Sequence, residues 1–235
     1  PKGMWPSEQS VSPEILSLLP NDIEWVISDE GILFNTLKYY PSRDSNRILE
    51  NPQILYQPYY MEVNGRKLNI IFRDINLSDS IGFVYSKMYA NLASKDLYNN
   101  IKLIQNKLTD DYPYLVTIAL DGENCWEHYD NDGYDFLTNL YQLLSDDETL
   151  NVTTVSKYLE EYPPERKLEN LFSGSWIRSD FTTWIGEPTK NKAWDCLYKA
   201  REELVKFENT FTKSKEILEK AWEEIYIAEG SDWFW

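Results

Sequence analysis

Three short apolar runs in the first half of the chain constrain the fold more than any other feature. They occupy residues 23–27, 68–72 and 114–120 and are rich in β-branched and aromatic residues without clean alternation. This pattern is typical of parallel strands buried on both faces. Apolar residues recur at helical spacing over residues 86–108, between the second and third runs. The sequence therefore predicts an α/β fold with a parallel sheet.

Carboxylates follow each of the three runs. Asp29 and Glu30 come after the first, Asp74 after the second, and Asp121 opens the segment after the third. Functional groups gather at the C-terminal ends of parallel strands. We therefore expect a carboxylate-lined pocket, although any one of these acids is equally well explained as a solvated loop residue.

In the second half of the chain, the apolar residues recur at helical spacing. After about residue 134, helical stripes occur within 136–144, 194–204 and 217–225, and Gly230 follows as a plausible stop. Residues 39–60, with three prolines and five tyrosines, predict a long ordered loop between the first two strands. A mostly helical region is expected beside the sheet.

The composition excludes several classes of function. Lys+Arg is 23 and Asp+Glu is 39, so the net charge of −16 disfavours nucleic acid and anionic membranes as partners. The lone His128 argues against a zinc site, and two cysteines cannot make a disulfide framework. The sequence has no phosphate-binding glycine loop, dinucleotide fingerprint or serine-hydrolase elbow. Aromatic residues reach 15%, which suits either stacking on sugars or a packed core.

The strongest candidate for chemistry is the cluster at residues 120–129. Asp121, Glu123 and Trp126 lie there, and Gly122 permits a sharp turn that aims neighbouring side chains into a cleft. A carboxylate beside an indole ring is poorly solvated, which raises its pKa and allows proton donation near neutrality. The alternative is an acidic turn that caps a helix beginning near Trp126.

A second cluster spans residues 3–10 and contains Trp5 and Glu8. From the residues alone, the better interpretation is a helix start, with Ser7 as N-cap and Glu8 in the first turn. Further Trp, Ser and Asp groups at 173–177, 180–188 and 231–235 fall outside any helical stripe. They are compatible with a domain interface or with a sugar-binding wall.

Six segments resemble the motifs of a known protein family, in their residues and in their order along the chain. They are Gly-Met-Trp-Pro-Ser-Glu at 3–8, Phe-Arg-Asp-x-x-Leu-Ser-Asp-x-Ile-Gly-Phe at 72–83, Leu-Asp-Gly-Glu-Asn at 120–124, Gly-Ser-Trp-Ile at 174–177, Asp-Phe-Thr-Thr-Trp-Ile-Gly-Glu-Pro at 180–188 and Glu-Gly-Ser-Asp-Trp-Phe-Trp at 229–235. This set, which spans essentially the whole chain, resembles glycoside hydrolase family 57, and most closely its amylopullulanase and α-amylase-type members.

The resemblance implies an α/β fold that is part of an incomplete (β/α)7 barrel followed by a mostly helical region. Residues 1–134 would form the C-terminal part of the catalytic barrel, and 135–235 the helical region that completes the cleft. It implies a retaining enzyme acting on α-glucans, α-1,4 and perhaps α-1,6 linked, without cofactor or metal. Glu8 matches the family's nucleophile and Asp121 its general acid/base, which replaces the helix-start interpretation of Glu8.

Six further residues are second-choice candidates for substrate binding or support of the site: Trp5, Asp74, Asp79, Glu123, Trp126 and Trp233. For Asp74, an equally good alternative is a structural acid paired with Arg73. The family's His-Gln-Pro motif and a second motif that precede the nucleophile are missing from this chain. We therefore expect a fragment that lacks the N-terminal strands of the catalytic domain, and its activity on its own is left open.

Two alternatives to a hydrolase remain. A 4-α-glucanotransferase on the same site would differ only in the acceptor that resolves the glycosyl-enzyme. A non-catalytic carbohydrate-binding fragment would keep the aromatic wall without a complete site. Linkage specificity, localisation and oligomeric state are not predicted by the sequence.

Overall fold

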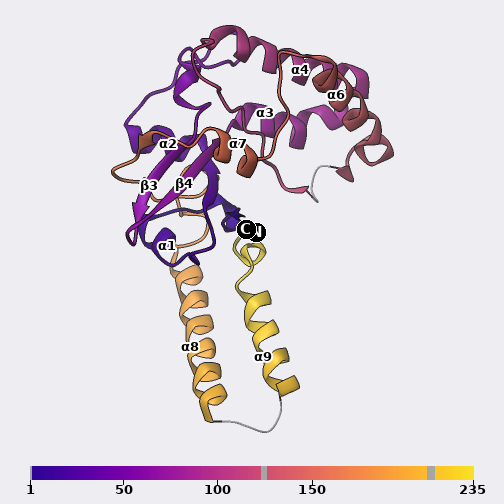
Figure 1. Cartoon of the computed structure of the whole chain (residues 1–235). Helices are drawn as coiled ribbons and strands as arrows, with labels where there is room; N and C mark the ends of the chain where they lie inside the picture. Colours follow the sequence, from indigo (N-terminus) through magenta and orange to yellow (C-terminus); the bar gives the residue numbers. More distant parts are fainter. Residues whose placement is uncertain (1, 123–125, 211–214) are drawn as a thin grey trace. The chain divides into compact units, whose positions relative to one another are not determined.

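The computed structural model describes residues 2–122, 126–210 and 215–235 (Figure 1). The chain divides into two compact units, Pro1–Ser179 and Asp180–Trp235. Residues 135–179 therefore belong to the same unit as the sheet, and the division does not coincide with the sequence-based boundary after residue 134. Within the described ranges, no helix is long and apolar enough to cross a membrane.

The first unit is built on a five-stranded sheet with the order β1-β2-β4-β3-β5. Its strands are β1 (Gly3–Met4), β2 (Trp25–Asp29), β3 (Tyr59–Val63), β4 (Arg66–Arg73) and β5 (Arg166–Lys167). β1, β2 and β4 run parallel, with Gly3 opposite Trp25 and Val26 opposite Ile70. The C-terminal ends of these three strands therefore meet at one edge of the sheet, as the sequence predicts for β2 and β4.

β3 and β4 form an antiparallel hairpin, which the sequence interpretation assigned in part to the long loop. The connection is Asn64-Gly65, and both residues have positive φ, 50° and 76°. Asn-Gly with two left-handed residues is the sequence that a two-residue hairpin turn prefers. The hairpin places β3 along the free side of β4.

The prediction of a third parallel strand over residues 114–120 is wrong. These residues run without strand structure, because β4 is already paired with β2 on one side and β3 on the other. The segment instead bonds to loops and helix ends at the sheet edge: Leu115 N donates to Tyr56 O (2.8 Å), and Thr117 O accepts from Asp74 N (2.9 Å). Most of its apolar residues are partly buried against the core, and Ala119 is fully buried, which is why its pattern resembles that of a strand.

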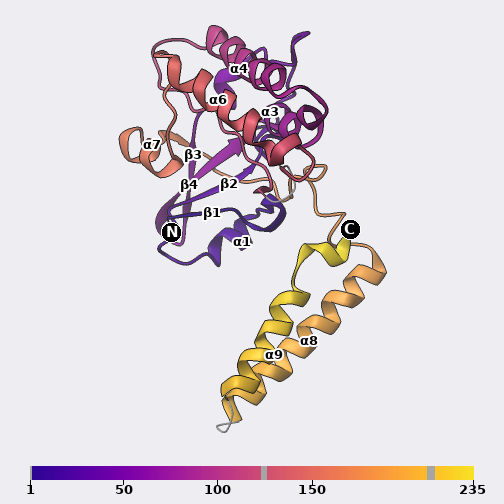
Figure 2. The same ribbon diagram turned by 90° about the vertical axis from the view of Figure 1, so that its right-hand side faces the viewer.

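The helices of the first unit cover this sheet. They are α1 (Pro13–Ser17), α2 (Glu30–Leu37), α3 (Ile75–Asp79), α4 (Ala90–Lys107), α6 (Tyr134–Asp146) and α7 (Val155–Glu161), with short turns η1 (Ser7–Gln9), η2 (Pro52–Ile54), η3 (Ser80–Val84), η4 (Tyr85–Lys87) and η5 (Asp130–Gly133). α4 confirms the helix predicted over 86–108 and packs along α6, as both views show (Figures 1 and 2). Their apolar faces join the side chains of β3 and β4 in one hydrophobic core.

The second unit consists of α8 (Pro188–Thr210), α9 (Lys215–Ala228) and a terminal turn η6 (Ser231–Phe234). α8 and α9 lie side by side (Figures 1 and 2), in agreement with the helical stripes of the sequence. Few side chains are buried: no residue of α8 and only Ile225 of α9. The Trp194 ring stacks on the Phe234 ring at 4.4 Å between centroids.

Candidate active site

Glu8 lies in a backbone turn that ordinary residues avoid. Glu8 and Gln9 both have positive φ, 54° and 51°, a conformation that costs about 1–2 kcal/mol for each non-glycine residue. The turn is held by contacts from elsewhere in the chain: Trp176 N donates to Glu8 O (3.0 Å) and Ser28 Oγ to Gln9 O (3.0 Å). Strain maintained by tertiary contacts is common at functional sites. The helix-start interpretation of Glu8 is wrong, because η1 is a single distorted turn.

The Glu8 carboxylate is oriented by Trp176. The indole Nε1–H of Trp176 donates to Glu8 Oε2 at 2.6 Å. Trp5 meets the Trp176 ring edge-on, with centroids 5.5 Å apart and an interplanar angle of 87°. All three side chains are partly buried, so the carboxylate is fixed in place while it remains near solvent.

Arg73, the last residue of β4, lies over the ring of Trp176. Its guanidinium lies 4.8 Å from the centre of the Trp176 ring, a cation–π distance. Arg73 is buried and forms ion pairs with Asp29 at the end of β2 (2.9 Å) and with Asp79 in α3 (3.0 Å). Burial raises the pKa of Asp29, and the Arg73 charge opposes that rise.

Arg73 also reaches the segment that leads to Asp121. Its Nη1 donates to the carbonyl of Ala119 at 3.4 Å, two residues before Asp121. The same segment is anchored where Ser78 Oγ accepts from Ala119 N (3.1 Å). Asp121 is partly buried. The two residues predicted to be catalytic thus belong to segments that contact one arginine, Glu8 through Trp176 and Asp121 through Ala119.

Asp74 has contacts that favour its structural alternative. It is 2% exposed and caps α3, because its Oδ1 accepts from Leu77 N (2.8 Å). Its Oδ2 accepts from the Tyr56 hydroxyl (2.6 Å) and lies 3.8 Å from Arg43 Nη1. Every oxygen of the side chain is therefore engaged within the protein. Asp79, in contrast, has a side chain that is 42% exposed and can face a ligand.

Glu30 is a buried acid beside this cluster. It pairs with Arg43 and accepts from Ile75 N at 3.1 Å. Burial, followed by the charge of nearby Asp74, raises the pKa of Glu30 to about 7. Glu30 therefore changes charge near neutral pH, although it is a structural rather than an exposed acid.

The remaining predicted site residues lie in different surroundings. Trp126 packs on Tyr129 and Phe136, with ring centroids 5.5 and 6.4 Å apart, so much of its ring serves the core. Glu123 lies outside the described residues. Trp233 is in the second unit, where it lines a pocket of about 450 Å³ and is 67% exposed.

Sequence reasoning did not assign Trp176 and Arg73 to the site, while Asp29 was expected only as one of several acids lining a pocket. Trp176 belongs to a Trp-containing cluster and to the Gly-Ser-Trp-Ile motif, but neither gave it a role, and its contact with Glu8 spans 168 positions of sequence. Arg73 was considered only as a partner for Asp74. Among the described residues, no group of three His, Cys, Asp or Glu side chains is arranged to hold a metal ion.

At the C-terminal edge of this α/β sheet, a carboxylate is held by an indole N–H beside a second indole ring, an arrangement that fits the class of carbohydrate-active enzymes. The comparison with known families agrees with this class. The model for glycosyl hydrolase family 57 matches residues 1–169. The chain belongs to glycosyl hydrolase family 57.

One curated relative is similar in sequence, and solved structures of family members are similar in fold. The 1,4-alpha-glucan branching enzyme of Thermococcus kodakarensis is 32% identical over 123 residues, which are 50% of this chain and 18% of the relative. The GH57-type branching enzyme from Pyrococcus horikoshii superimposes with a TM-score of 0.72 at 16% identity, over 99% of this chain and 51% of that one. The 4-alpha-glucanotransferase from Thermococcus litoralis superimposes with a TM-score of 0.57 at 21% identity, over 88% of this chain and 29% of that one.

These matches identify the sheet and its helices as part of the (β/α)7 barrel domain of the family. The chain spans about half the length of the branching-enzyme structure and a smaller share of the curated relative. The relatives named here are branching enzymes and a glucanotransferase, and an α-amylase from Thermotoga maritima also matches. The narrower amylopullulanase type stays a prediction.

Proposed function

We propose that this chain carries both catalytic carboxylates of a retaining enzyme that cleaves α-glucosidic links in α-glucans. The observation that carries the proposal is the Glu8 carboxylate, held by the Trp176 N–H in a strained turn at the C-terminal edge of the sheet. A nucleophile needs a fixed direction of attack and an accessible oxygen. Trp176 engages Oε2, and attack is assigned to the other oxygen.

The reaction proceeds by double displacement. Glu8 attacks the anomeric carbon and forms the glycosyl-enzyme ester, while Asp121, protonated, gives its proton to the departing glycosidic oxygen. Asp121 then removes a proton from the incoming water, whose oxygen bonds to the anomeric carbon and releases Glu8. Two inversions at that carbon give overall retention.

Transfer to a sugar hydroxyl is the second candidate. The observation that favours it is the 32% identity to a branching enzyme, which passes a glucan chain to another sugar. The same two carboxylates serve both outcomes, and only the acceptor differs. Product analysis with and without added maltooligosaccharide acceptor distinguishes water from sugar as the acceptor.

The nucleophile is tested by covalent trapping. 5-Fluoro-α-D-glucosyl fluoride loses fluoride to the nucleophile and leaves a slowly hydrolysed ester, which peptide mass spectrometry locates. We expect the label on Glu8 and its loss in Glu8→Gln. Glu14→Gln, which changes an exposed glutamate in α1, is the matched control and should label like the wild-type chain. Absence of the label, or a label at another acid, contradicts the proposal.

A further inference from the structure

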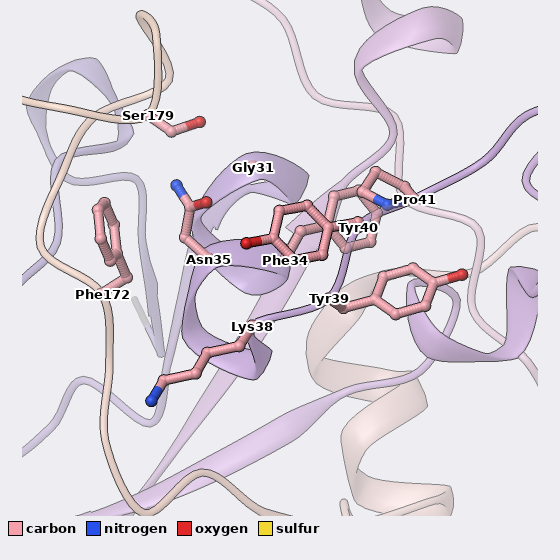
Figure 3. Close-up of a pocket in the computed structure, with 9 residues that line it drawn as sticks. All are labelled: Gly31, Phe34, Asn35, Lys38, Tyr39, Tyr40, Pro41, Phe172 and Ser179. Atoms are coloured by element: carbon pink, nitrogen blue, oxygen red, sulfur yellow. The ribbon is translucent and has the colours of Figure 1, made fainter.

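A pocket of about 390 Å³ lies in the first unit between α2 and two loop segments (Figure 3). This is within the usual range of about 300–1,000 Å³ for small-ligand sites. Nine residues line the pocket, among them Phe34, Asn35, Lys38, Tyr40, Phe172 and Ser179. The fold creates it where α2 ends: Lys38 adopts a left-handed conformation (φ 52°), and Tyr39 N donates to Phe34 O (2.9 Å). This helix end turns residues 39–41 back along α2.

Aromatic rings dominate the pocket and two of them face solvent. Tyr40 is 93% exposed and Phe172 is 42% exposed, although each has a large apolar surface that water solvates poorly. Tyr39 and Phe34 pack together at 5.7 Å between centroids and form a fixed wall, and the Tyr39 hydroxyl accepts from the Asn51 amide (3.0 Å). Flat exposed rings on a fixed wall suit the apolar C–H face of a pyranose.

The polar groups of the pocket are available to a ligand. Asn35 and Lys38 are exposed, and within the described part of the chain neither side chain forms a hydrogen bond or ion pair. The nine lining residues include no carboxylate, although the chain contains 39 acidic residues. An amide and an ammonium group beside aromatic rings fit a neutral ligand rich in hydroxyl groups.

The pocket is lined by residues of segments that also contribute to the candidate active site. Phe172 and Ser179 lie on either side of Trp176 in one short segment, and that segment is fixed to α2 because Phe172 N donates to Thr36 Oγ1 (2.9 Å). Gly31, on the opposite wall, donates its N–H to Asp29 Oδ1 (2.9 Å), and Asp29 is the partner of Arg73. A polymer bound near Glu8 therefore has this aromatic pocket within the same set of elements.

We propose that this pocket is a second glucan-binding site, which holds a short run of α-linked glucose units and takes no part in bond cleavage. Tyr40 and Phe172 supply the stacking surfaces, and Asn35 and Lys38 bond to sugar hydroxyls. The choice of glucan as ligand rests on the proposed function.

The test uses the 235-residue chain with Glu8→Gln, so that the probe, maltoheptaose, is not consumed. Hydrogen exchange of peptides covering residues 34–41 reports the pocket, and titration calorimetry gives the affinity. We expect maltoheptaose to slow exchange in these peptides, and Tyr40→Ala/Phe172→Ala to remove that protection and weaken the pocket's affinity about tenfold. The matched control is Tyr141→Ala, which changes an exposed tyrosine of α6. It should leave the protection from exchange and the affinity for maltoheptaose unchanged.

Glu8 trapping separates this inference from the proposed function. With Glu8 restored, Tyr40→Ala/Phe172→Ala should label at Glu8 within about twofold of the wild-type rate. Labelling at Glu8 without pocket protection by maltoheptaose overturns the second site alone. If Glu8 is not labelled and maltoheptaose does not protect the pocket, the second site and the proposed function are both overturned. Protection by inorganic phosphate in place of maltoheptaose, abolished by Lys38→Met, also overturns it and identifies an anion site.

Discussion

The Trp176 side chain offers a direct test of how Glu8 is oriented. Trp176→Phe keeps an aromatic ring that can contact Trp5 and Arg73 but removes the N–H that donates to Glu8 Oε2. A hydrogen bond to a charged group contributes about 1.5–3 kcal/mol, so we expect trapping of Glu8 to slow about 10- to 100-fold. The rate is measured by mass spectrometry at several reagent concentrations.

The control for Trp176→Phe is Trp222→Phe. Trp222 also has an arginine over its ring, Arg201 at 5.6 Å, but lies in α9 of the second unit. In the Trp222→Phe variant, the reagent should label Glu8 at the wild-type rate. If Trp176→Phe labels Glu8 as fast as the wild-type chain, the indole N–H does not position the nucleophile.

Glu30 makes stability depend on pH. Its pKa is about 7 in the folded chain against 4.5 ordinarily, so the folded state binds the proton more tightly than the unfolded state. The contribution of Glu30 is fully present below about pH 4.5 and is lost as pH rises through 7, by up to about 3 kcal/mol. Glu30→Gln should remove this part of the slope in urea unfolding between pH 5 and 8.

An exposed glutamate provides the comparison for Glu30→Gln. Glu50 has a side chain that is 52% exposed, and Glu50→Gln should keep the wild-type dependence of the unfolding free energy on pH. A Glu30→Gln variant whose free energy of unfolding varies with pH as steeply as that of the wild-type chain would show that Glu30 is ionised normally.

The candidate site was only partly predictable at the scale of single residues. Asp121 follows directly after a partly buried apolar segment, and an acid in that position is visible in the sequence. Glu8 is different, because local capping rules predict a helix start, whereas the strained turn is held by Ser28 and by Trp176, which lies 168 positions away. Asp29 and Arg73 were recognisable as charged residues at strand ends, but their pairing required the order of the strands.

At the scale of elements, the β3–β4 hairpin explains why one strand prediction failed. Strand patterns report burial on a sheet-like surface, and residues 114–120 satisfy them without pairing. The Asn64-Gly65 turn decides which segment occupies the side of β4. The hairpin signal was present in the sequence, and giving it weight would have assigned β3 correctly.

The turn itself makes a prediction. Gly65 has φ of 76°, and a Cβ added there meets no atom within 4 Å. Gly65→Ala therefore changes only the backbone preference, and we expect a loss of about 1 kcal/mol in the free energy of unfolding. In Gly82→Ala the added Cβ also has open space but φ is not left-handed, so stability should stay equal or rise. Equal effects of the two variants would contradict the turn assignment.

At the scale of the whole molecule, the two units differ in what holds them together. The sheet unit has a continuous core that extends from β2 and β4 to α4 and α6. In the second unit, the buried hydrophobic side chains among the described residues are Trp184, Ile225 and Phe234. Helices of this length with so little burial are marginal by propensity alone, so the second unit is expected to open well before the sheet.

Native-state hydrogen exchange measures this difference directly. Amides of α8 and α9 should exchange faster than those of β2 and β4, because local opening needs less free energy where few apolar contacts are lost. Phe234→Ala removes the ring stacked on Trp194 and should accelerate exchange in α8 and α9 while β4 exchanges as before. Leu140→Ala, in the core of the sheet unit, should have the opposite selectivity. If every variant changes exchange in both units together, the chain unfolds as one cooperative body and the difference in burial does not set its stability.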